Sequence, residues 1–177
     1  MDNVLWQQAV KFHGHECGGL ALGVRAAIEA CRRFDVERVK DEEVVCVTEN
    51  DACGVDGIQY VLGCTLGKGN LVYHDTGKFA FSFFDRRTGD AFRLIAKDKR
   101  EDLHGREYIE FVLNAPLEEV FDVGSPRISV PEKAKSLNSI KCAICGEAAP
   151  ENKIRIMDGK HVCLDCHSEY SRGWQRS

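Results

Sequence analysis

The chain has 177 residues, 44% of them hydrophobic and 29% charged, which is typical of one globular domain or of one domain with a small added module. The 28 acidic residues outnumber the 24 basic ones, and this argues against a protein whose main task is to neutralise nucleic-acid phosphates. No apolar run reaches the ~18 residues of a membrane span, and the first residues lack signal-peptide character, so we expect a cytoplasmic protein without a membrane partner. Nine cysteines in that compartment indicate metal or redox chemistry more than a disulfide framework.

A group of metal-binding side chains lies between the first two expected helices. Residues 4–11 form a short amphipathic segment, and Phe12-His13-Gly14-His15-Glu16-Cys17-Gly18-Gly19 follows it. From residue 20 to residue 34 apolar side chains recur at three- and four-residue steps, which predicts a second helix with one buried face. Cys17 therefore lies at the N-terminus of this helix, where the helix dipole favours the thiolate that a metal requires. The glycines allow a turn in which His15 and Cys17 converge on one ion.

The next expected elements are a strand, a loop and a third helix. Residues 44–48 are β-branched and of strand length, and the loop after them places Cys53 just ahead of a helix over residues 55–62. A glycine-rich segment, residues 63–70, follows the helix. Its spacing departs from that of a nucleotide-binding P-loop, but its backbone N–H groups and Lys68 could contact a substrate carboxylate or phosphate.

Extended segments dominate from residue 71 onward, where three strands joined by short turns favour an antiparallel meander. The strands are expected over residues 71–74, 79–84 and 91–95. Helices over residues 106–114 and 117–121 follow, and then a proline-rich segment with at most one edge strand. The expected fold class is therefore α+β, an antiparallel sheet packed with helices, with a core domain over residues 1–132 and a polar linker over residues 133–140.

The C-terminal segment, residues 141–177, carries two Cys-x-x-Cys pairs separated by 17 residues. The four cysteines are Cys142, Cys145, Cys163 and Cys166. Each pair can chelate one ion, and Asp158-Gly159 predicts a hairpin turn between the pairs, so a structural four-thiolate Zn²⁺ site is expected. A final helix from residue 168 to about residue 174 would complete a treble-clef zinc finger. So short a module buries little core, and the zinc should supply most of its folding free energy.

Several ordered motifs resemble the E-subunit family of formylmethanofuran dehydrogenase. The motifs are Phe12-His13-Gly14-His15-Glu16-Cys17 with Gly23 and Arg25 after it, Asp51-Ala52-Cys53-Gly54-Val55-Asp56-Gly57-Ile58-Gln59, Gly63-Cys64-Thr65-Leu66-Gly67-Lys68-Gly69-Asn70-Leu71, and Gly77-Lys78. The resemblance covers most of residues 5–130 and implies an α+β core, to which some members add a C-terminal treble-clef zinc finger. Gly18 and Gly57 stand where Pro and Ala are common in the family, and neither change removes a ligand.

The resemblance also implies a function class. In methanogens the family is associated with the molybdenum or tungsten pterin enzyme that interconverts carbon dioxide and formylmethanofuran, although the family's own chain does not carry the pterin centre. An accessory role in one-carbon metabolism related to methanogenesis follows, with pterin-dependent oxidoreductase subunits as partners. Relatives also occur where that pathway is absent, so the substrate stays open.

The same motifs suggest which residues meet in the core. His15 and Cys17 would converge with Cys53 and Cys64 on a second transition-metal ion, for which thiolate and imidazole suit zinc and also nickel, copper or iron. The alternative is that Cys53 and Cys64 are only buried thiols. If three protein groups bind, the open position would hold a water for hydrolytic or Lewis-acid chemistry. His13 or Glu16, the candidate catalytic residues, would then orient a ligand or take a proton.

Three functions follow from these patterns. The first is an accessory metal-binding protein that docks on a pterin-dependent one-carbon redox enzyme. The second is a free-standing small metalloenzyme that acts on an acyl or formyl compound at the His15/Cys17 site. The third is nucleic-acid binding through the zinc finger, which the acidic neighbours of its basic residues disfavour. A homodimer is the default expectation for the oligomeric state.

Overall fold

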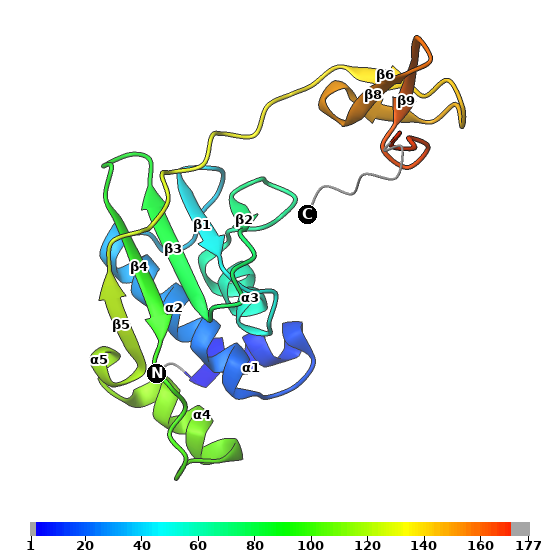
Figure 1. The fold of residues 1–177 in the computed structure, drawn as a ribbon. Helices are drawn as coiled ribbons and strands as arrows, with labels where there is room; N and C mark the ends of the chain where they lie inside the picture. Colours follow the sequence, from blue (N-terminus) through cyan, green and yellow to red (C-terminus); the bar gives the residue numbers. More distant parts are fainter. Residues whose placement is uncertain (1–2, 171–177) are drawn as a thin grey trace. The chain divides into compact units, whose positions relative to one another are not determined.

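The computed structural model describes residues 3–170, and the chain forms two compact units, Met1–Ala134 and Lys135–Ser177 (Figure 1). The first unit contains a five-stranded sheet with the strand order β2-β1-β3-β4-β5. Its strands are β1 (Val44–Thr48), β2 (Leu71–Tyr73), β3 (Ala80–Asp85), β4 (Ala91–Ala96) and β5 (Phe121–Gly124). Its helices are α1 (Asn3–His13), α2 (Gly18–Phe34), α3 (Gly54–Gly57), the π-helical turn η1 (Ile58–Leu62), α4 (Gly105–Asn114) and α5 (Leu117–Val120). The α+β class is therefore confirmed.

The main core lies between the sheet and the helices. Phe81 and Phe83 of β3 are fully buried, because side chains two residues apart on a strand point to the same face. Helix α2 crosses that face (Figure 1) and adds fully buried Leu20 and Val24 from its apolar stripe. The long second helix predicted from the periodicity is thus the element against which the sheet packs.

The second, third and fourth strands were predicted to pair in chain order as an antiparallel meander. The first of these pairings is wrong. Strand β1 lies between β2 and β3, and it pairs with β2 in parallel and with β3 antiparallel. Every residue of β1 is buried, which is the pattern of a central strand, whereas the short β2 becomes exposed toward its end, as an edge strand does. The residues after β2 pass the end of β1, where His74 N–H donates to Thr48 O at 2.9 Å. Short turns alone therefore did not fix the strand order.

The parallel pair needs a crossover connection, and this connection contains α3 and η1. The helix predicted over residues 55–62 begins as one turn of α-helix and continues as a π-helical turn that ends at Gly63. Gly63 has a φ of 86°, a left-handed conformation that favours glycine. The crossover thus starts in the loop that carries Cys53 and ends in the loop that carries Cys64.

The second unit contains two small antiparallel pairs. They are β6 (Ser139–Lys141) with β7 (Ala148–Pro150), and β8 (Ile154–Met157) with β9 (Lys160–Cys163), with the 3₁₀ turn η2 (Glu151–Lys153) before β8. Asp158 and Gly159 connect β8 to β9 with φ values of 51° and 75°, as a two-residue hairpin turn of type I′ requires. Residues 168–170 are not helical, and the rest of the predicted final helix lies outside the described residues.

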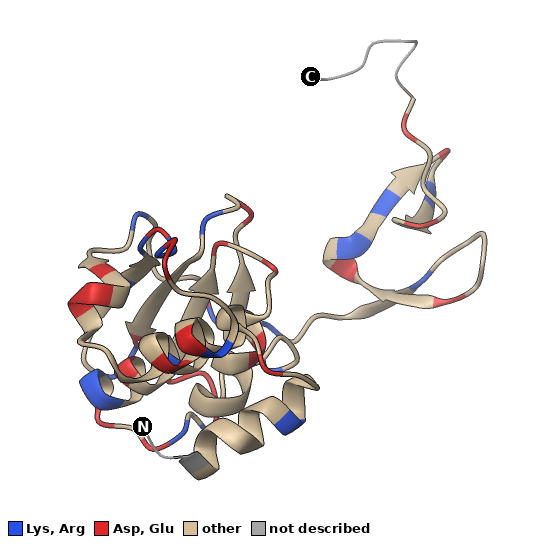
Figure 2. Ribbon diagram, turned by 90° about the horizontal axis from the view of Figure 1, so that it is seen from below, with Lys and Arg blue, Asp and Glu red and all other residues tan. Residues whose placement is uncertain are grey.

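Basic and acidic residues are interspersed along the ribbon in the described parts of each unit (Figure 2). Helix α2 shows how such pairs form locally, since Glu29 accepts from Arg32 and Arg33 one turn further along the helix. Within residues 3–170, no helix combines the length and the apolar character that crossing a membrane would require.

Candidate metal centre

Helices α2 and α3 approach each other backbone to backbone at glycines. A Cβ added to Gly23 would lie 1.9 Å from the carbonyl oxygen of Gly54, and one added to Gly57 would lie 2.5 Å from the backbone nitrogen of Val24. No larger residue fits this contact without separating the two helices. The close contact brings together the residues that cap the two helix N-termini, Cys17 for α2 and Cys53 for α3.

Four side chains converge at this point. One ligand atom from each of His13, His15, Cys17 and Cys53 lies within 4.8 Å of every other. His13 ends α1, and Gly14 with a φ of 102° reverses the chain so that the two imidazole rings lie 4.5 Å apart, centroid to centroid. His15 is exposed, and the other three side chains are half-buried. We refer to these four residues as the core cluster.

Asp56 holds His13 in a defined orientation. His13 Nδ1 donates to Asp56 Oδ2 at 2.7 Å, and Gln59 Nε2 donates to Asp56 Oδ1 at 3.1 Å. With the proton on Nδ1, the lone pair of Nε2 faces the cluster, 3.9 Å from Cys17 Sγ. A carboxylate on the far nitrogen of an imidazole is the usual support of a metal-binding histidine. His13 is therefore placed to bind an ion directly, and not only to orient a ligand or act as a base.

The two thiols of the core cluster influence each other. Burial raises the pKa of Cys53, and the neighbouring Cys17 thiol and the Asp56 carboxylate raise it further. Cys17 Sγ accepts a hydrogen bond from Leu20 N–H at 3.3 Å. Like charges at this distance repel, so both thiols would ionise together only around a cation. Two imidazoles and two thiols form a donor set that fits a tetrahedral transition-metal ion, above all zinc.

Cys64 lies outside the core cluster, so the prediction that it is a ligand of the core metal is wrong. Cys64 Sγ donates to the carbonyl oxygen of Val44 at 3.5 Å, and burial raises its pKa to about 12. Val44 begins β1, whereas Cys53 follows the other end of that strand. The parallel crossover therefore places Cys53 and Cys64 at opposite ends of β1. Cys64 is a core thiol, which was the alternative left open from the sequence.

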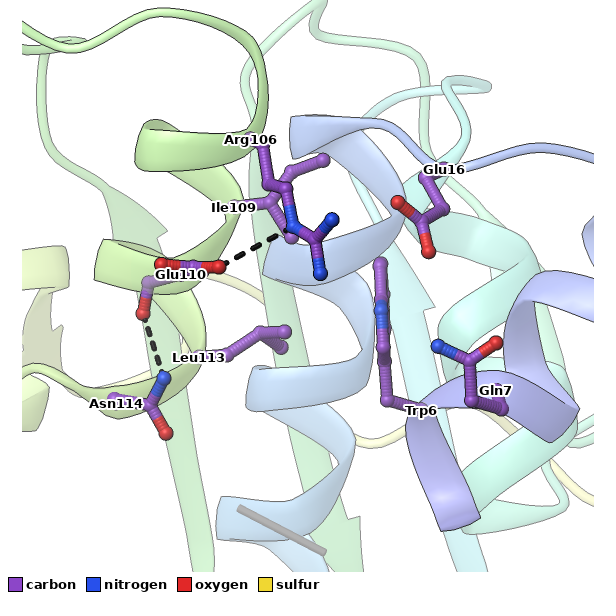
Figure 3. A pocket seen from close by; sticks show the side chains of 8 residues that line it. All are labelled: Trp6, Gln7, Glu16, Arg106, Ile109, Glu110, Leu113 and Asn114. Atoms are coloured by element: carbon purple, nitrogen blue, oxygen red, sulfur yellow. Dashed lines mark hydrogen bonds and ion pairs between the residues drawn. The ribbon is translucent and has the colours of Figure 1, made fainter. Parts of the chain in front are cut away.

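Lys68 and Glu16 also have other surroundings than predicted. Lys68 Nζ donates to the carbonyl oxygen of Val39 at 3.1 Å, so its charge is directed at the backbone and not at a bound anion. Glu16 is exposed and lies beside Arg106 and Trp6 at a separate pocket of about 280 Å³ between α1 and α4 (Figure 3). Neither residue belongs to the core cluster.

The sequence did not indicate Asp56 as a site residue, and it suggested His13 only as a group that orients a ligand or takes a proton. Asp56 stands three residues after Cys53, a spacing that places two side chains on the same side of a helical turn. That spacing was the available signal for Asp56. The structure also shows a pocket of about 400 Å³ that is lined in part by His13, Cys53 and Asp56.

The second unit brings its four cysteines together. One Sγ atom from each lies within 4.8 Å of every other, and the residues are Cys142, Cys145, Cys163 and Cys166. The backbone N–H groups of Ile144 and Cys163 each donate to Cys142 Sγ at 3.4 Å. Hydrogen bonds from the backbone at Cys163, Cys145 and Ile144 lower the pKa of Cys142 to about 6. The backbone thus stabilises the Cys142 thiolate, whereas the neighbouring thiols raise the pKa of Cys166 to about 12. Four thiols this close together suit a closed structural zinc site.

Comparisons with known proteins agree with both units. Residues 12–122 match the family described as "FmdE, Molybdenum formylmethanofuran dehydrogenase operon", and residues 135–172 match the prokaryotic dksA/traR C4-type zinc finger. A protein from Archaeoglobus fulgidus described as a probable S-adenosyl-L-methionine-binding protein is 29% identical over an alignment of 196 positions, which covers 92% of this chain and 52% of the relative. The chain thus spans about half the length of that curated relative.

A solved structure shows the same fold. The crystal structure of a tungsten formylmethanofuran dehydrogenase FmdE-like protein from Syntrophus aciditrophicus superposes with a TM-score of 0.64 and 21% sequence identity. The superposition covers 90% of this chain and 88% of the other. Together with the family match over most of the first unit, it confirms the resemblance inferred from the motifs. The chain belongs to the FmdE family and carries a C4-type zinc finger after the FmdE domain.

Proposed function

We propose that the protein is a zinc-binding accessory partner of a molybdenum- or tungsten-pterin one-carbon redox enzyme, with one zinc ion in the core cluster and a structural zinc ion in the finger. The observation that carries the core site is the orientation of His13 by Asp56, which leaves Nε2 facing the thiols. The redox partner is supported by the family description, which names the operon of a molybdenum formylmethanofuran dehydrogenase.

Each residue of the core site has a separate task in this proposal. Cys17 and Cys53 supply negative charge, and the two imidazoles complete a four-donor set. Asp56 keeps the Nδ1 proton of His13 in place, so that Nε2 is available without a change of tautomer. A zinc ion held by all four donors would be fully coordinated, and it would supply Lewis-acid chemistry only if one of the four left a coordination position open.

The zinc content of the purified full-length protein tests the core site. We expect two equivalents of zinc per chain by plasma mass spectrometry, one for each four-residue cluster. The substitutions Cys53→Ala and His13→Ala should each lower the content to one equivalent. Cys64→Ala is the matched control, because it removes a thiol of the same unit that lies outside the cluster, and it should keep two. One equivalent in the unsubstituted protein, unchanged by Cys53→Ala, would refute the core site.

Affinity purification from the native cell tests the accessory role. A tagged full-length chain should recover subunits of an oxidoreductase that contains molybdenum or tungsten, detected by mass spectrometry and by metal analysis of the complex. The finger offers a second surface for such docking, since a structural zinc module serves protein contacts well. Repeated purifications under mild conditions that recover no oxidoreductase would contradict this role, whatever the zinc content is.

A second candidate function is a free-standing metalloenzyme that acts on an acyl or formyl compound. The observation in its favour is the pocket of about 400 Å³ beside His13 and Cys53, a volume that fits a small organic molecule. The purified protein alone should then turn over such a compound, and Cys17→Ala should abolish the turnover. Activity that is unchanged in Cys17→Ala would remove this candidate. The interspersed charges in Figure 2 give no specific support to nucleic-acid binding through the finger.

A further inference from the structure

The pocket beside the core cluster has the composition of a ligand site. It measures about 400 Å³ and lies where β1 and β2 end, next to the start of α3. His13 and Cys53 line it and also belong to the core cluster, so a bound molecule would lie directly against the metal-binding groups. The lining residues on which the ligand class depends are Asp51, Asp56, Leu66, Leu71 and Tyr73.

Apolar side chains form part of the wall and remain accessible at the rim. Leu66 is 73% exposed and Tyr73 is 48% exposed, although both are large apolar side chains. Leu71 and Val55 continue the apolar wall inward. A concave, partly apolar surface with a few polar groups is the usual form of a small-molecule site. A ligand with an apolar body would remove these side chains from water.

The charged groups of the pocket decide which kind of ligand it takes. Asp51 and Asp56 line it, and none of its lining residues is Lys or Arg. Partial loss of water contact raises the pKa of Tyr73. The hydrogen bond with Asp75 and the charges of Asp51 and Asp75 raise this pKa further. Two carboxylates therefore lie near the Tyr73 side chain. Two thiolates would balance the charge of a Zn²⁺ ion in the core cluster, so the metal would not reverse the sign of the pocket.

We propose that this pocket binds a small organic cation with an apolar body, an aryl- or alkylammonium compound, and excludes organic anions. The cationic group would lie between the Asp51 carboxylate and the face of Tyr73, where Coulomb attraction and the ring quadrupole both favour it. The apolar body would lie against Leu66 and Leu71. This inference rests on the proposed function in one respect, because it makes the pocket the entrance to the core zinc site.

Three probes of similar shape and different charge test the proposal. Benzylammonium, benzyl alcohol and benzoate would be titrated into the zinc-loaded full-length protein at pH 7 and followed by two-dimensional NMR. We expect saturable shifts at the pocket residues, with benzylammonium bound about 10-fold more tightly than benzyl alcohol through the ring and carboxylate contacts, and benzoate bound most weakly. Asp51→Asn and Tyr73→Leu should each remove most of this preference. Glu118→Gln, an exposed carboxylate on α5 at the opposite edge of the sheet, should not change it.

Zinc analysis of the same samples separates this proposal from the proposed function. A protein that holds two zinc ions but binds benzoate as tightly as benzylammonium overturns the ligand class and leaves the metal site intact. The absence of saturable binding by all three probes overturns it as well. A protein that lacks the core zinc but still prefers benzylammonium, with the preference lost in Asp51→Asn, supports the ligand class and refutes the proposed metal function.

Discussion

The contact between α2 and α3 can be tested by adding one methyl group at Gly23. The substitution Gly23→Ala places a Cβ 1.9 Å from the carbonyl oxygen of Gly54. Ordinary contact begins at 3.4 Å, so α3 would have to withdraw by about 1.5 Å. The obstacle is backbone, and no side-chain rotation relieves it. Because Cys17 and Cys53 begin the two helices, the same movement would separate the two thiols of the core cluster.

The expected magnitudes differ for stability and for metal binding. Alanine is favoured over glycine inside a helix by about 1 kcal/mol, but the clash is with backbone, which cannot move aside cheaply. Overpacking should therefore reach at least the upper end of its usual range of about 1–3 kcal/mol, and the metal-free protein should lose about 2 kcal/mol or more. A zinc site tolerates displacements of only about 0.2 Å in its ligand distances. A displacement of about 1.5 Å should therefore abolish the core site. The variant would also lose the zinc-dependent stabilisation, which is about 4 kcal/mol when free zinc is 1,000 times its Kd.

The assay combines zinc analysis with denaturant unfolding, each with and without added zinc. Gly23→Ala should bind one zinc per chain, and added zinc should not stabilise its first unit. Gly124→Ala is the matched control, since a Cβ there meets no atom within 4 Å, and it should behave like the unsubstituted protein. Two tightly bound zinc ions in Gly23→Ala with unchanged stabilisation would refute the argument that this glycine contact positions the ligands.

Three further perturbations have defined outcomes. Asp56→Asn should weaken zinc binding at the core site by about 10- to 100-fold in a chelator competition, because it loosens the orientation of His13. Arg93→Met should cost about 3–5 kcal/mol of unfolding free energy at pH 7, because Glu49, bonded to Arg93 at 2.6 and 3.1 Å, would stay buried without its partner. Cys166→Ser should remove the finger zinc alone, with the core zinc retained in metal analysis.

The pH dependence of the Arg93→Met effect supplies an internal check. The hydrogen bond from Arg93 lowers the pKa of Glu49, so this carboxylate stabilises the folded protein fully above the pKa of an unfolded glutamate. That stability is lost as pH falls through the lowered pKa. In the variant, Glu49 keeps the hydrogen bond from Thr76 Oγ1 at 2.8 Å but loses the guanidinium of Arg93. Burial should then raise the pKa of Glu49 above its value in the unsubstituted protein, and protonation should relieve the defect. The difference from the unsubstituted protein should thus shrink from pH 7 to pH 4, and a difference that grows toward pH 4 would contradict the assignment.

Controls for the first two variants are available on the surface. Asp122→Asn changes a carboxylate whose side chain is 70% exposed, and it should leave zinc affinity unchanged where Asp56→Asn lowers it. Arg100→Met breaks an exposed ion pair with Asp102, and it should leave the unfolding free energy unchanged. Loss of the core zinc in Cys166→Ser would contradict the independence of the two sites.

Local patterns predicted most elements of the first unit. The stripe of α2 and the β-branched run of β1 were found within two residues of their observed ends, because burial of one helix face or of a whole strand leaves a direct pattern in the sequence. The order of the strands left no such pattern. The position of β1 between β2 and β3 depends on which strand is buried most completely, and that is a property of the assembled sheet.

The candidate site was predictable to the extent that its ligands stand in short motifs. His15 and Cys17 could be named from the turn ahead of the second helix, Cys53 from the motifs shared with the family, and the four finger cysteines from their spacing. The exclusion of Cys64 could not be predicted, because it follows from the direction of the crossover between β1 and β2. The orientation of the His13 ring toward the core cluster likewise could not be predicted, because it depends on Asp56, 43 residues away in the chain.

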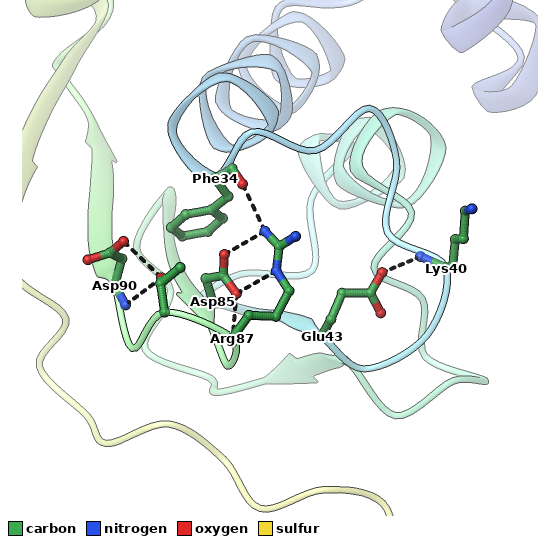
Figure 4. A network of polar contacts seen from close by, with 7 residues as sticks. Phe34, Lys40, Glu43, Asp85, Arg87 and Asp90 are labelled. Atoms are coloured by element: carbon green, nitrogen blue, oxygen red, sulfur yellow. Dashed lines mark hydrogen bonds and ion pairs between the residues drawn. The ribbon is translucent and has the colours of Figure 1, made fainter.

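Neighbours along the chain are enough to specify the types of donor atom, the helix that carries Cys17 at its start, and the finger motif. Which donors meet and which charges are paired depends on contacts between segments far apart in the chain. Arg87 illustrates the second case: it donates to Asp85 two residues away and also to the carbonyl oxygen of Phe34, 53 residues away, at 2.8 Å (Figure 4). The physical reason is that such contacts form only when helices and sheet pack, and the backbone-to-backbone approach at Gly23 sets how close the metal-binding residues come.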